Sequence, residues 1–163
     1  VLHPALTEEV CLRLLRAAGT PEAVILHCRA VAGMDARLLE RLPADIKGSE
    51  TIDREKLFSA ALLHDIARTR KNHASVGAEW VRMLGYPEAA ALIAAHHDYS
   101  GTALNEAALL FLADKYVQDD REVTLEERFR KSRERCATEE ALAANERRFA
   151  AAKALERQLR TQE

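Results

Sequence analysis

The chain has 163 residues, the length of one ordinary domain, which can bury a core without disulfides or a structural metal. Apolar residues make up 48% of it and aromatics only 5%, and the excess of Ala and Leu favours helices over strands. The formal net charge of -2 has no extreme of sign. This argues against nucleic-acid and membrane-surface binders and favours a small substrate.

Cysteine usage and the lack of long apolar runs indicate a cytoplasmic protein. Cys11, Cys28 and Cys136 are odd in number and far apart, which argues against a disulfide framework or a cysteine zinc site. No apolar run approaches the roughly 20 residues that span a bilayer, and the N-terminus lacks a signal-peptide pattern. The chain begins with Val rather than Met, as a piece of a longer protein would.

Helix start and stop signals predict the first elements. A first helix is expected over about residues 6–18, and a second from Pro21 until Pro43, carrying His27. The polar segment from Asp45 to Glu50 is predicted to be a loop.

Four further helices are predicted before residue 120, and two of them are apolar on nearly every side, as core helices are. Their expected bounds are Asp53 to Ala67, Asn72 or Ser75 to Leu84, Pro87 to about His97, and Asn105 to Gln118. Gly85, Tyr86 and Pro87 break the chain between two of these helices.

The last segment differs in character from the rest. Residues 121–163 hold 11 of the 24 basic and 9 of the 26 acidic residues, which predicts one or two amphipathic helices with a solvated charged face. A partner-binding helix is the alternative. The whole chain, 1–163, is predicted to be a single all-α domain with a core at about 20–120.

Metal-capable side chains follow strongly apolar runs four times. AVIL precedes His27, FSAALL precedes His64 and Asp65, AAALIAA precedes the pair His96 and His97, and AALLFLA precedes Asp114. Burying an unpaired carboxylate costs several kcal/mol, and a divalent cation would satisfy several such groups together.

Each residue also has a simpler interpretation. A single core histidine such as His27 or His73 is more often a hydrogen-bonded packing residue, and a buried arginine could pair with Asp65. The number of groups favours a metal, because five of the six histidines lie on predicted helices beside two aspartates. Imidazole and carboxylate ligands without a nearby cysteine indicate a divalent transition metal such as Fe, Mn, Co, Zn or Ni.

The ordered set resembles the HD-domain metal-dependent phosphohydrolases. The matching segments are AALLHDIAR, NHASVGA, HHD and LADK, over about residues 20–120. The resemblance implies an all-α HD-domain bundle of about six to eight helices. It also implies a first metal held by His27, His64, Asp65 and Asp114, and a second held by His73, His96 and His97 with Asp65 bridging.

Two departures narrow the resemblance. Family members with a third metal often have a Glu where this chain has Ala23, so a third ion is not predicted. The HD-GYP subfamily has its GYP motif after the histidine pair, whereas here Gly85–Pro87 lies before it. Cleavage of cyclic dinucleotides is therefore not predicted, and the small bacterial HD domains are the nearest match.

The expected activity is hydrolysis of a phosphate ester or phosphoanhydride of a small molecule, for example a nucleotide, by metal-activated hydroxide. His64, Asp65 and Arg68 are the predicted catalytic residues, and Arg68, Lys71 and Lys115 the predicted phosphate-binding residues. An ordinary solvated charge is the alternative for each of these cations. Two other functions remain open, namely a di-iron oxygenase of HD type and a non-catalytic metal-binding regulatory module.

Overall fold

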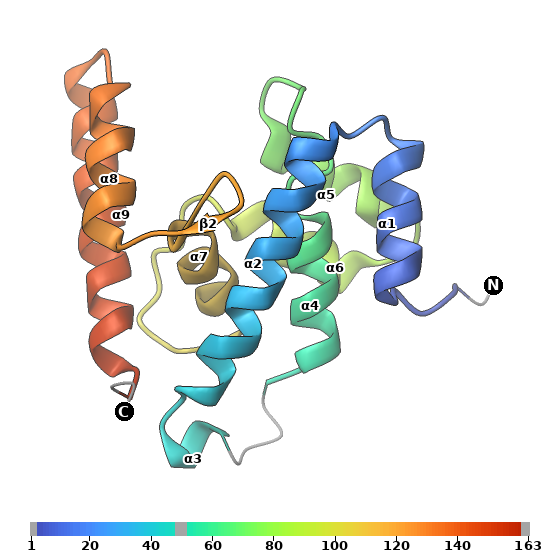
Figure 1. Cartoon of the computed structure of the whole chain (residues 1–163), viewed down its shortest axis with the longest axis horizontal. Coiled ribbons are helices and arrows are strands. Elements are labelled where there is room, and N and C mark those ends of the chain that lie inside the picture. Colours follow the sequence, from blue (N-terminus) through green and yellow to red (C-terminus); the bar gives the residue numbers. More distant parts are fainter. Residues whose placement is uncertain (1–2, 48–51, 161–163) are drawn as a thin grey trace.

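The computed structural model describes residues 3–47 and 52–160, and within these ranges it contains nine helices and a two-stranded antiparallel sheet (Figure 1). The helices are α1 (Glu8–Ala17), α2 (Glu22–Glu40), α3 (Ala44–Lys47), α4 (Arg54–Leu63), α5 (His73–Met83), α6 (Pro87–Ala95), α7 (Glu106–Lys115), α8 (Leu125–Glu134) and α9 (Glu139–Gln158). The strands are β1 (Val117–Gln118) and β2 (Arg121–Glu122), and they pair Val117 with Glu122 and Gln118 with Arg121.

Five of these helices begin at a residue whose side chain accepts a hydrogen bond from a backbone N–H two or three positions into the helix. Such an N-cap satisfies one of the donors that a helix start leaves free. The capping residues of α1, α4, α7, α8 and α9 are Thr7, Asp53, Asn105, Thr124 and Thr138.

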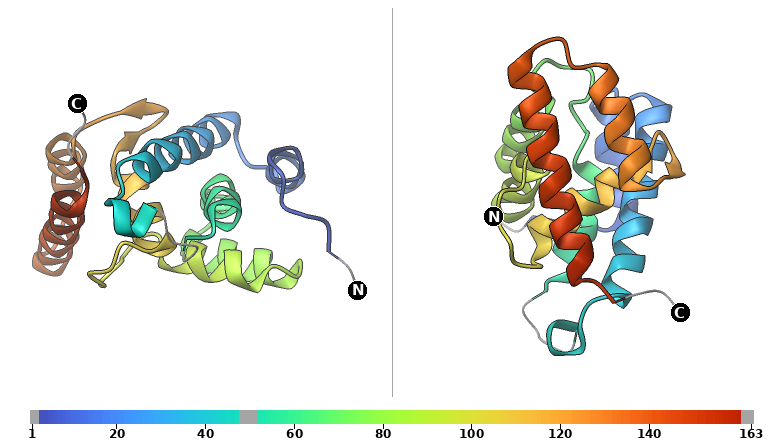
Figure 2. Two further views of the ribbon diagram at one scale, coloured as in Figure 1. Left: turned by 90° about the horizontal axis from the view of Figure 1, so that it is seen from below. Right: turned by 90° about the vertical axis from the view of Figure 1, so that its left-hand side faces the viewer.

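Helices α4 and α7 form the centre of the domain. Their side chains are buried almost all round, including Leu57, Leu63, Leu109 and Phe111, which have no exposed surface. Helix α2 packs against both of them, α6 covers the other side of α4, and α5 packs on α6. Figure 2 shows α4 enclosed between α2 and α6 in its left view.

The two C-terminal helices, α8 and α9, form a hairpin that packs on α7 at one end of the molecule (Figures 1 and 2). Leu125, Phe129 and Leu155 are the buried contacts of this hairpin. Its last turn is also tied to the end of α2, because the Arg160 backbone N–H donates to the Arg41 carbonyl at 2.8 Å. The charge-rich segment is thus an amphipathic helix pair, as predicted.

The all-α class is confirmed, and the described residues hold one helix more than the six to eight expected. The additional element is α3, which makes the loop prediction wrong at residues 45–47; residues 48–50 lie outside the described residues. Its turn begins after Pro43, whose carbonyl accepts from the Ile46 N–H at 3.0 Å. Proline favours a helix start because its φ is fixed near the helical value.

Three predicted helix ends lie too late in the sequence. Helix α4 ends at Leu63, α6 at Ala95 and α7 at Lys115. The pairs His64–Asp65 and His96–His97 therefore follow the ends of their helices, and Asp114 lies in the last turn of α7. The break at Gly85 is confirmed, because its φ of +101° is open only to glycine without strain. Across the described residues, no helix is long and apolar enough to cross a membrane.

Candidate metal centre

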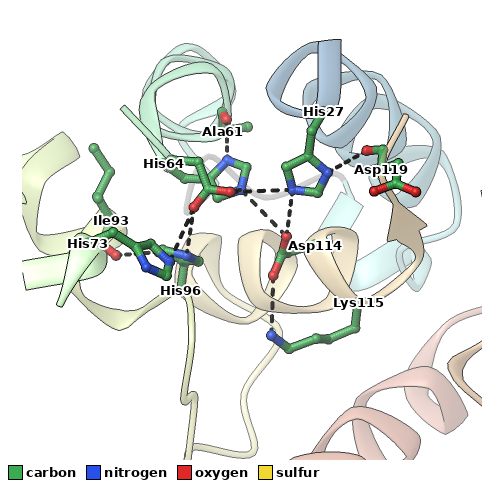
Figure 3. Close-up of polar contacts among 10 residues, drawn as sticks. His27, Ala61, His64, His73, Ile93, His96, Asp114, Lys115 and Asp119 are labelled. Carbon is green, nitrogen blue, oxygen red and sulfur yellow. Dashed lines mark hydrogen bonds and ion pairs between the residues drawn. The ribbon is translucent and has the colours of Figure 1, made fainter. Parts of the chain in front are cut away.

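Four histidines and two aspartates come together near the centre of the domain, from five different helices or their ends. His27 lies on α2, His64 caps the end of α4 with Asp65 next to it, and His73 begins α5. His96 caps the end of α6, and Asp114 lies in the last turn of α7. Figure 3 shows the labelled imidazoles of this group converging on the space beside Asp114.

Asp65 lies between two pairs of imidazoles. Its Oδ2 is 3.6 Å from His27 Nε2 and 3.5 Å from His64 Nε2. Its Oδ1 is 3.5 Å from His73 Nε2 and 3.7 Å from His96 Nε2. Each carboxylate oxygen therefore faces a different pair of ring nitrogens.

Asp114 completes the first of these groups. Its Oδ1 is 3.1 Å from His27 Nε2 and 3.5 Å from His64 Nε2. Most of the separations around the two carboxylates are longer than a hydrogen bond of 2.7–3.2 Å. They match two ligands of one tetrahedral ion, which stand about 3.4 Å apart when each is about 2.1 Å from the metal.

Three of the rings are oriented by hydrogen bonds from their far nitrogen. Nδ1 of His27, His64 and His96 lies 2.6 Å from the carbonyl oxygens of Asp119, Ala61 and Ile93, in that order (Figure 3). A carbonyl only accepts, so each Nδ1–H must donate. The Nε2 atom of the neutral ring then presents its lone pair to the cluster, as metal-ligating histidines do.

The ends of α4 and α6 supply two of these carbonyls. The last carbonyls of a helix have no partner within it, and the cap histidine reaches back three residues to one of them. His64 uses Ala61 in this way and His96 uses Ile93. The carbonyl that orients His27 comes instead from the β1–β2 turn, where Asp119 has a φ of +58°.

The turn after Asp65 is held by buried contacts. Thr20 Oγ1 donates to the Ile66 carbonyl at 3.0 Å. Helix α5 approaches the same turn closely at Gly77, where an added Cβ would lie 3.1 Å from Ile66 Cγ2. A larger residue at position 77 would therefore require Ile66 or α5 to shift by a few tenths of an ångström.

The group formed by His27, His64 and Asp114 keeps a negative carboxylate in a buried place, as a cation site requires. Burial by itself raises the pKa of Asp114, but the Lys115 ammonium and the adjacent His27 and His64 rings hold this pKa well below its ordinary value. Burial opposes protonation of His64, yet the neighbouring Asp65 carboxylate raises the pKa of this histidine well above its ordinary value. A proton thus occupies the ring where a metal ion would replace it.

The second group is neutral apart from its carboxylate. Burial, and then the positive charge of His64, lower the pKa of His96 to about 4. Burial also lowers the pKa of His73. Both rings therefore hold free lone pairs at neutral pH, and they face the Asp65 oxygen that the first group does not use.

The donor set fits divalent metal. Two overlapping sets have ligand atoms within 4.8 Å of one another, namely His27, His64 and Asp114, and His64, Asp65 and His96. The buried His64 Nε2 has no hydrogen-bond partner, an arrangement that is costly unless a cation fills the space.

The other predicted site residues are placed less centrally. The His97 ring centroid lies 6.2 Å from those of His73 and His96, but the residue is exposed. Within residues 3–47 and 52–160, no ion pair joins it to Asp65 or Asp114. Its role as a metal ligand stays a prediction.

The three predicted phosphate-binding cations differ in position. Arg68 and Lys71 are exposed, and Arg68 is near enough to His73 to lower the pKa of that ring, after the larger effects of burial and of Asp65. Lys115 is not a solvated charge, because it is 2% exposed and its Nζ lies 3.2 Å from Asp114 Oδ2.

The sequence interpretation missed Asp35. This residue lies two turns after His27 on the same face of α2, and it is completely buried with neither carboxylate oxygen hydrogen-bonded. Burial raises its pKa well above the ordinary value. Its place between Met34 and Leu38, both buried, was the available signal.

The fold and this cluster identify the class of protein, and comparison with known proteins agrees. The HD domain model matches residues 24–119, more than half of the chain and the whole of the cluster. The chain belongs to the HD domain family.

The chain is also similar to individual proteins, and it spans only part of the length of each. It is 41% identical over 110 residues to an uncharacterized protein of Methanocaldococcus jannaschii, covering 66% of this chain and 62% of that one. It is 30% and 32% identical to tRNA (cytidine(56)-2'-O)-methyltransferases of Picrophilus torridus and Thermoplasma volcanium. Those matches cover 74% and 69% of this chain but 33% and 32% of the enzymes. No solved structure is significantly similar to it.

Proposed function

We propose that this chain is a divalent-metal-dependent phosphohydrolase that cleaves a phosphate ester or phosphoanhydride of a small molecule, a nucleotide being the first class to test. The observation that carries the proposal is the placement of Asp65, whose two oxygens face separate pairs of imidazoles at 3.5–3.7 Å. A carboxylate placed in this way is suited to bridge two cations. Membership of the HD family supports the same chemistry.

His27, His64 and Asp114 would hold one ion, and His73 and His96 the other, with Asp65 shared between them. Ions held there would supply Lewis acidity and a water of lowered pKa at neutral pH. The protein's own contribution is orientation, because Nδ1 hydrogen bonds fix three of the rings. The exposed Arg68, beside His73, would in addition bind a phosphate oxygen of the substrate.

A separate surface hollow of about 1100 Å³ is less suited to this chemistry. It lies between the segment before α1 and helices α2, α4 and α6, and its lining contains none of the cluster residues. The hollow is lined by a mixture of apolar and charged side chains, without a convergent set of metal ligands. We therefore place the reaction at the buried cluster.

The test is metal analysis combined with a substrate panel, with Asp65→Ala as the variant and Asp98→Ala as its control. Asp98 lies next to the histidine pair but is exposed. For the wild type we expect close to two ions per chain and hydrolysis with Mn or Co under anaerobic conditions. Only Asp65→Ala should lose both the bound metal and the hydrolytic activity. The panel includes mononucleotides, dinucleoside polyphosphates and RNA ends, since two relatives are named as tRNA enzymes.

Two results would contradict the proposal. Oxygen uptake by the iron-loaded protein without phosphate release would indicate an oxygenase of HD type. If a chelator lowers the melting temperature of the protein and no substrate is turned over, the chain is a metal-stabilised regulatory module.

A further inference from the structure

We infer that Lys115, Arg128 and Arg148 form an anion subsite beside the metal centre, which binds additional phosphate groups of the substrate. This inference rests on the proposed function, and it narrows the substrate to phosphoanhydrides or polyphosphorylated nucleotides. Arg128 and Arg148 belong to α8 and α9, outside the residues that match the HD family. The C-terminal hairpin would thus add specificity to a shared catalytic core.

The first step of the argument is position. Lys115 follows Asp114, and its Nζ lies 3.2 Å from the Asp114 Oδ2 atom, while Asp114 Oδ1 faces His27 and His64. Figure 3 shows the Lys115 side chain leaving α7 on the side of Asp114 away from the labelled histidines. The ammonium therefore borders the metal cluster on one side and the hairpin on the other.

Arg148 reaches the same region from α9. Its Nε lies 3.4 Å from Asp98 Oδ1, in the turn that follows His96 and His97. Burial lowers the pKa of His97, and the charges of Lys115 and Arg148 lower it further. Arg128 and Arg148 likewise act on Lys115, whose pKa is lowered first by burial. The packing of α8 and α9 on α7, with Arg148 paired to Asp98 and Lys115 beside Asp114, brings these side chains to the same end of the metal centre.

The second step is charge and hydrogen-bond balance. Lys115 is 2% exposed, and the Nε atoms of Arg128 and Arg148 are buried without a hydrogen-bond partner. Among the described residues, the acids paired with this group are Asp114, which also serves the histidines, and Asp98, which is exposed. In the described part of the chain, Arg128 Nε has no acceptor, and Arg148 Nε has only the long 3.4 Å contact with the exposed Asp98 carboxylate. Buried donors without a hydrogen bond are costly, and the oxygens of a polyphosphate would satisfy them.

The hairpin is held firmly enough to carry such a subsite. Lys153 Nζ on α9 bonds Glu126 Oε1 on α8 at 2.8 Å, and Gln158 Nε2 donates to the Thr102 carbonyl at 2.8 Å. Tyr116 at the end of α7 donates to Glu156. The hairpin is thus fixed both to α7 and to the loop that carries Asp98.

The experiment measures binding of inorganic tripolyphosphate to chelator-treated, metal-free protein by calorimetry at low ionic strength. We expect Arg148→Gln and Arg128→Gln each to weaken binding about tenfold, as loss of a charge-assisted contact does. Arg147→Gln, an exposed neighbour on α9, should change affinity little. If Arg148→Gln fails to fold, Arg148→Lys and Arg128→Gln provide the measurement.

The variant Asp98→Asn distinguishes tripolyphosphate binding by Arg148 from a structural role of the Arg148–Asp98 ion pair. It removes the partner of Arg148 but keeps the guanidinium, so binding should be unchanged or tighter. Weakening by Asp98→Asn equal to that by Arg148→Gln would overturn the inference, as would equal effects of the Arg147 and Arg148 variants. Arginine-dependent binding in a protein without hydrolase activity would refute the proposed function alone. If the wild type hydrolyses its substrate but Arg148→Gln and Arg128→Gln change neither KM nor tripolyphosphate binding, the subsite alone is refuted.

Discussion

Two pairs of adjacent polar residues, His64–Asp65 and His96–His97, end two helices of this molecule and place their second residues differently. In both, the first ring donates from Nδ1 to the carbonyl three residues earlier, at 2.6 Å. Asp65 then lies in the cluster at 6% exposure, whereas His97 is exposed. The end of a helix thus fixes the first side chain, and the chain that follows decides where the second one lies.

The two following turns explain the difference. After Asp65 the chain stays in the core, where Ile66 and Ala67 are buried and Thr20 bonds the Ile66 carbonyl. After His97 it runs outward, with Asp98 exposed. We conclude that the buried turn, rather than the residue pair itself, places Asp65 between the two pairs of imidazoles.

The strongest test of this comparison replaces the second residue of each pair. Asp65→Asn keeps the shape of the side chain but removes its charge, and we expect activity to fall more than about a hundredfold with loss of metal. His97→Asn should cost less than about tenfold. Metal content and turnover measured on both proteins decide the matter, and equal losses would show that the two positions are equivalent.

The buried His96 should give the metal-free protein a distinct dependence on pH. Its pKa is about 4 when folded and 6.5 in the unfolded chain. Its contribution to the free energy of unfolding is therefore complete above pH 6.5 and is lost as pH falls towards 4. The loss amounts to roughly 3 kcal/mol.

Urea denaturation of wild type and His96→Gln at several pH values isolates this contribution. His97 titrates in the same window, and the raised pKa of Asp35 works in the opposite direction, but both groups are present in both proteins. The raised pKa of His64 acts above pH 6.5. A stability difference between the two proteins that is constant from pH 6.5 to 4 would contradict the prediction.

The turns also differ in charge, since Arg68 lies in the first of them and Tyr99 and Ser100 lie in the second. We expect Arg68→Ala to raise KM about tenfold, the effect of one lost contact to a phosphate, with metal content unchanged. Arg70→Ala is the matched control, because that guanidinium lies over the Trp80 ring, 5.8 Å from its centroid. If the Arg68 variant loses its metal, Arg68 supports the metal centre and is not a substrate-binding residue.

Much of this architecture could be predicted from the sequence, because the relevant signals are local. Apolar runs identify α4 and α7 as core helices, and the same runs lead into His64, Asp65 and Asp114. Capping residues locate most helix starts. The family resemblance groups the six cluster residues, together with His97, from the sequence alone.

The remainder depends on contacts between distant segments. The predicted end of α4 lies too late because Ile66 and Ala67 continue the apolar composition past the point where the backbone turns. Burial of Lys115 follows from docking of the hairpin on α7, and burial of Asp35 from packing of α2. No periodicity in the sequence reports that Arg128 and Arg148 would face the end of α7.

The smallest predicted effect concerns the anchor that makes the two turns different. Thr20→Val removes the hydroxyl that donates to the buried Ile66 carbonyl at 3.0 Å while keeping the shape of the side chain. We expect a loss of about 1 kcal/mol in the free energy of unfolding, measured by urea denaturation. Thr69→Val, at an exposed position of the same turn, should cost less. If Thr20→Val is as stable as the wild type, packing around Ile66 and Ala67 alone holds Asp65 in the cluster.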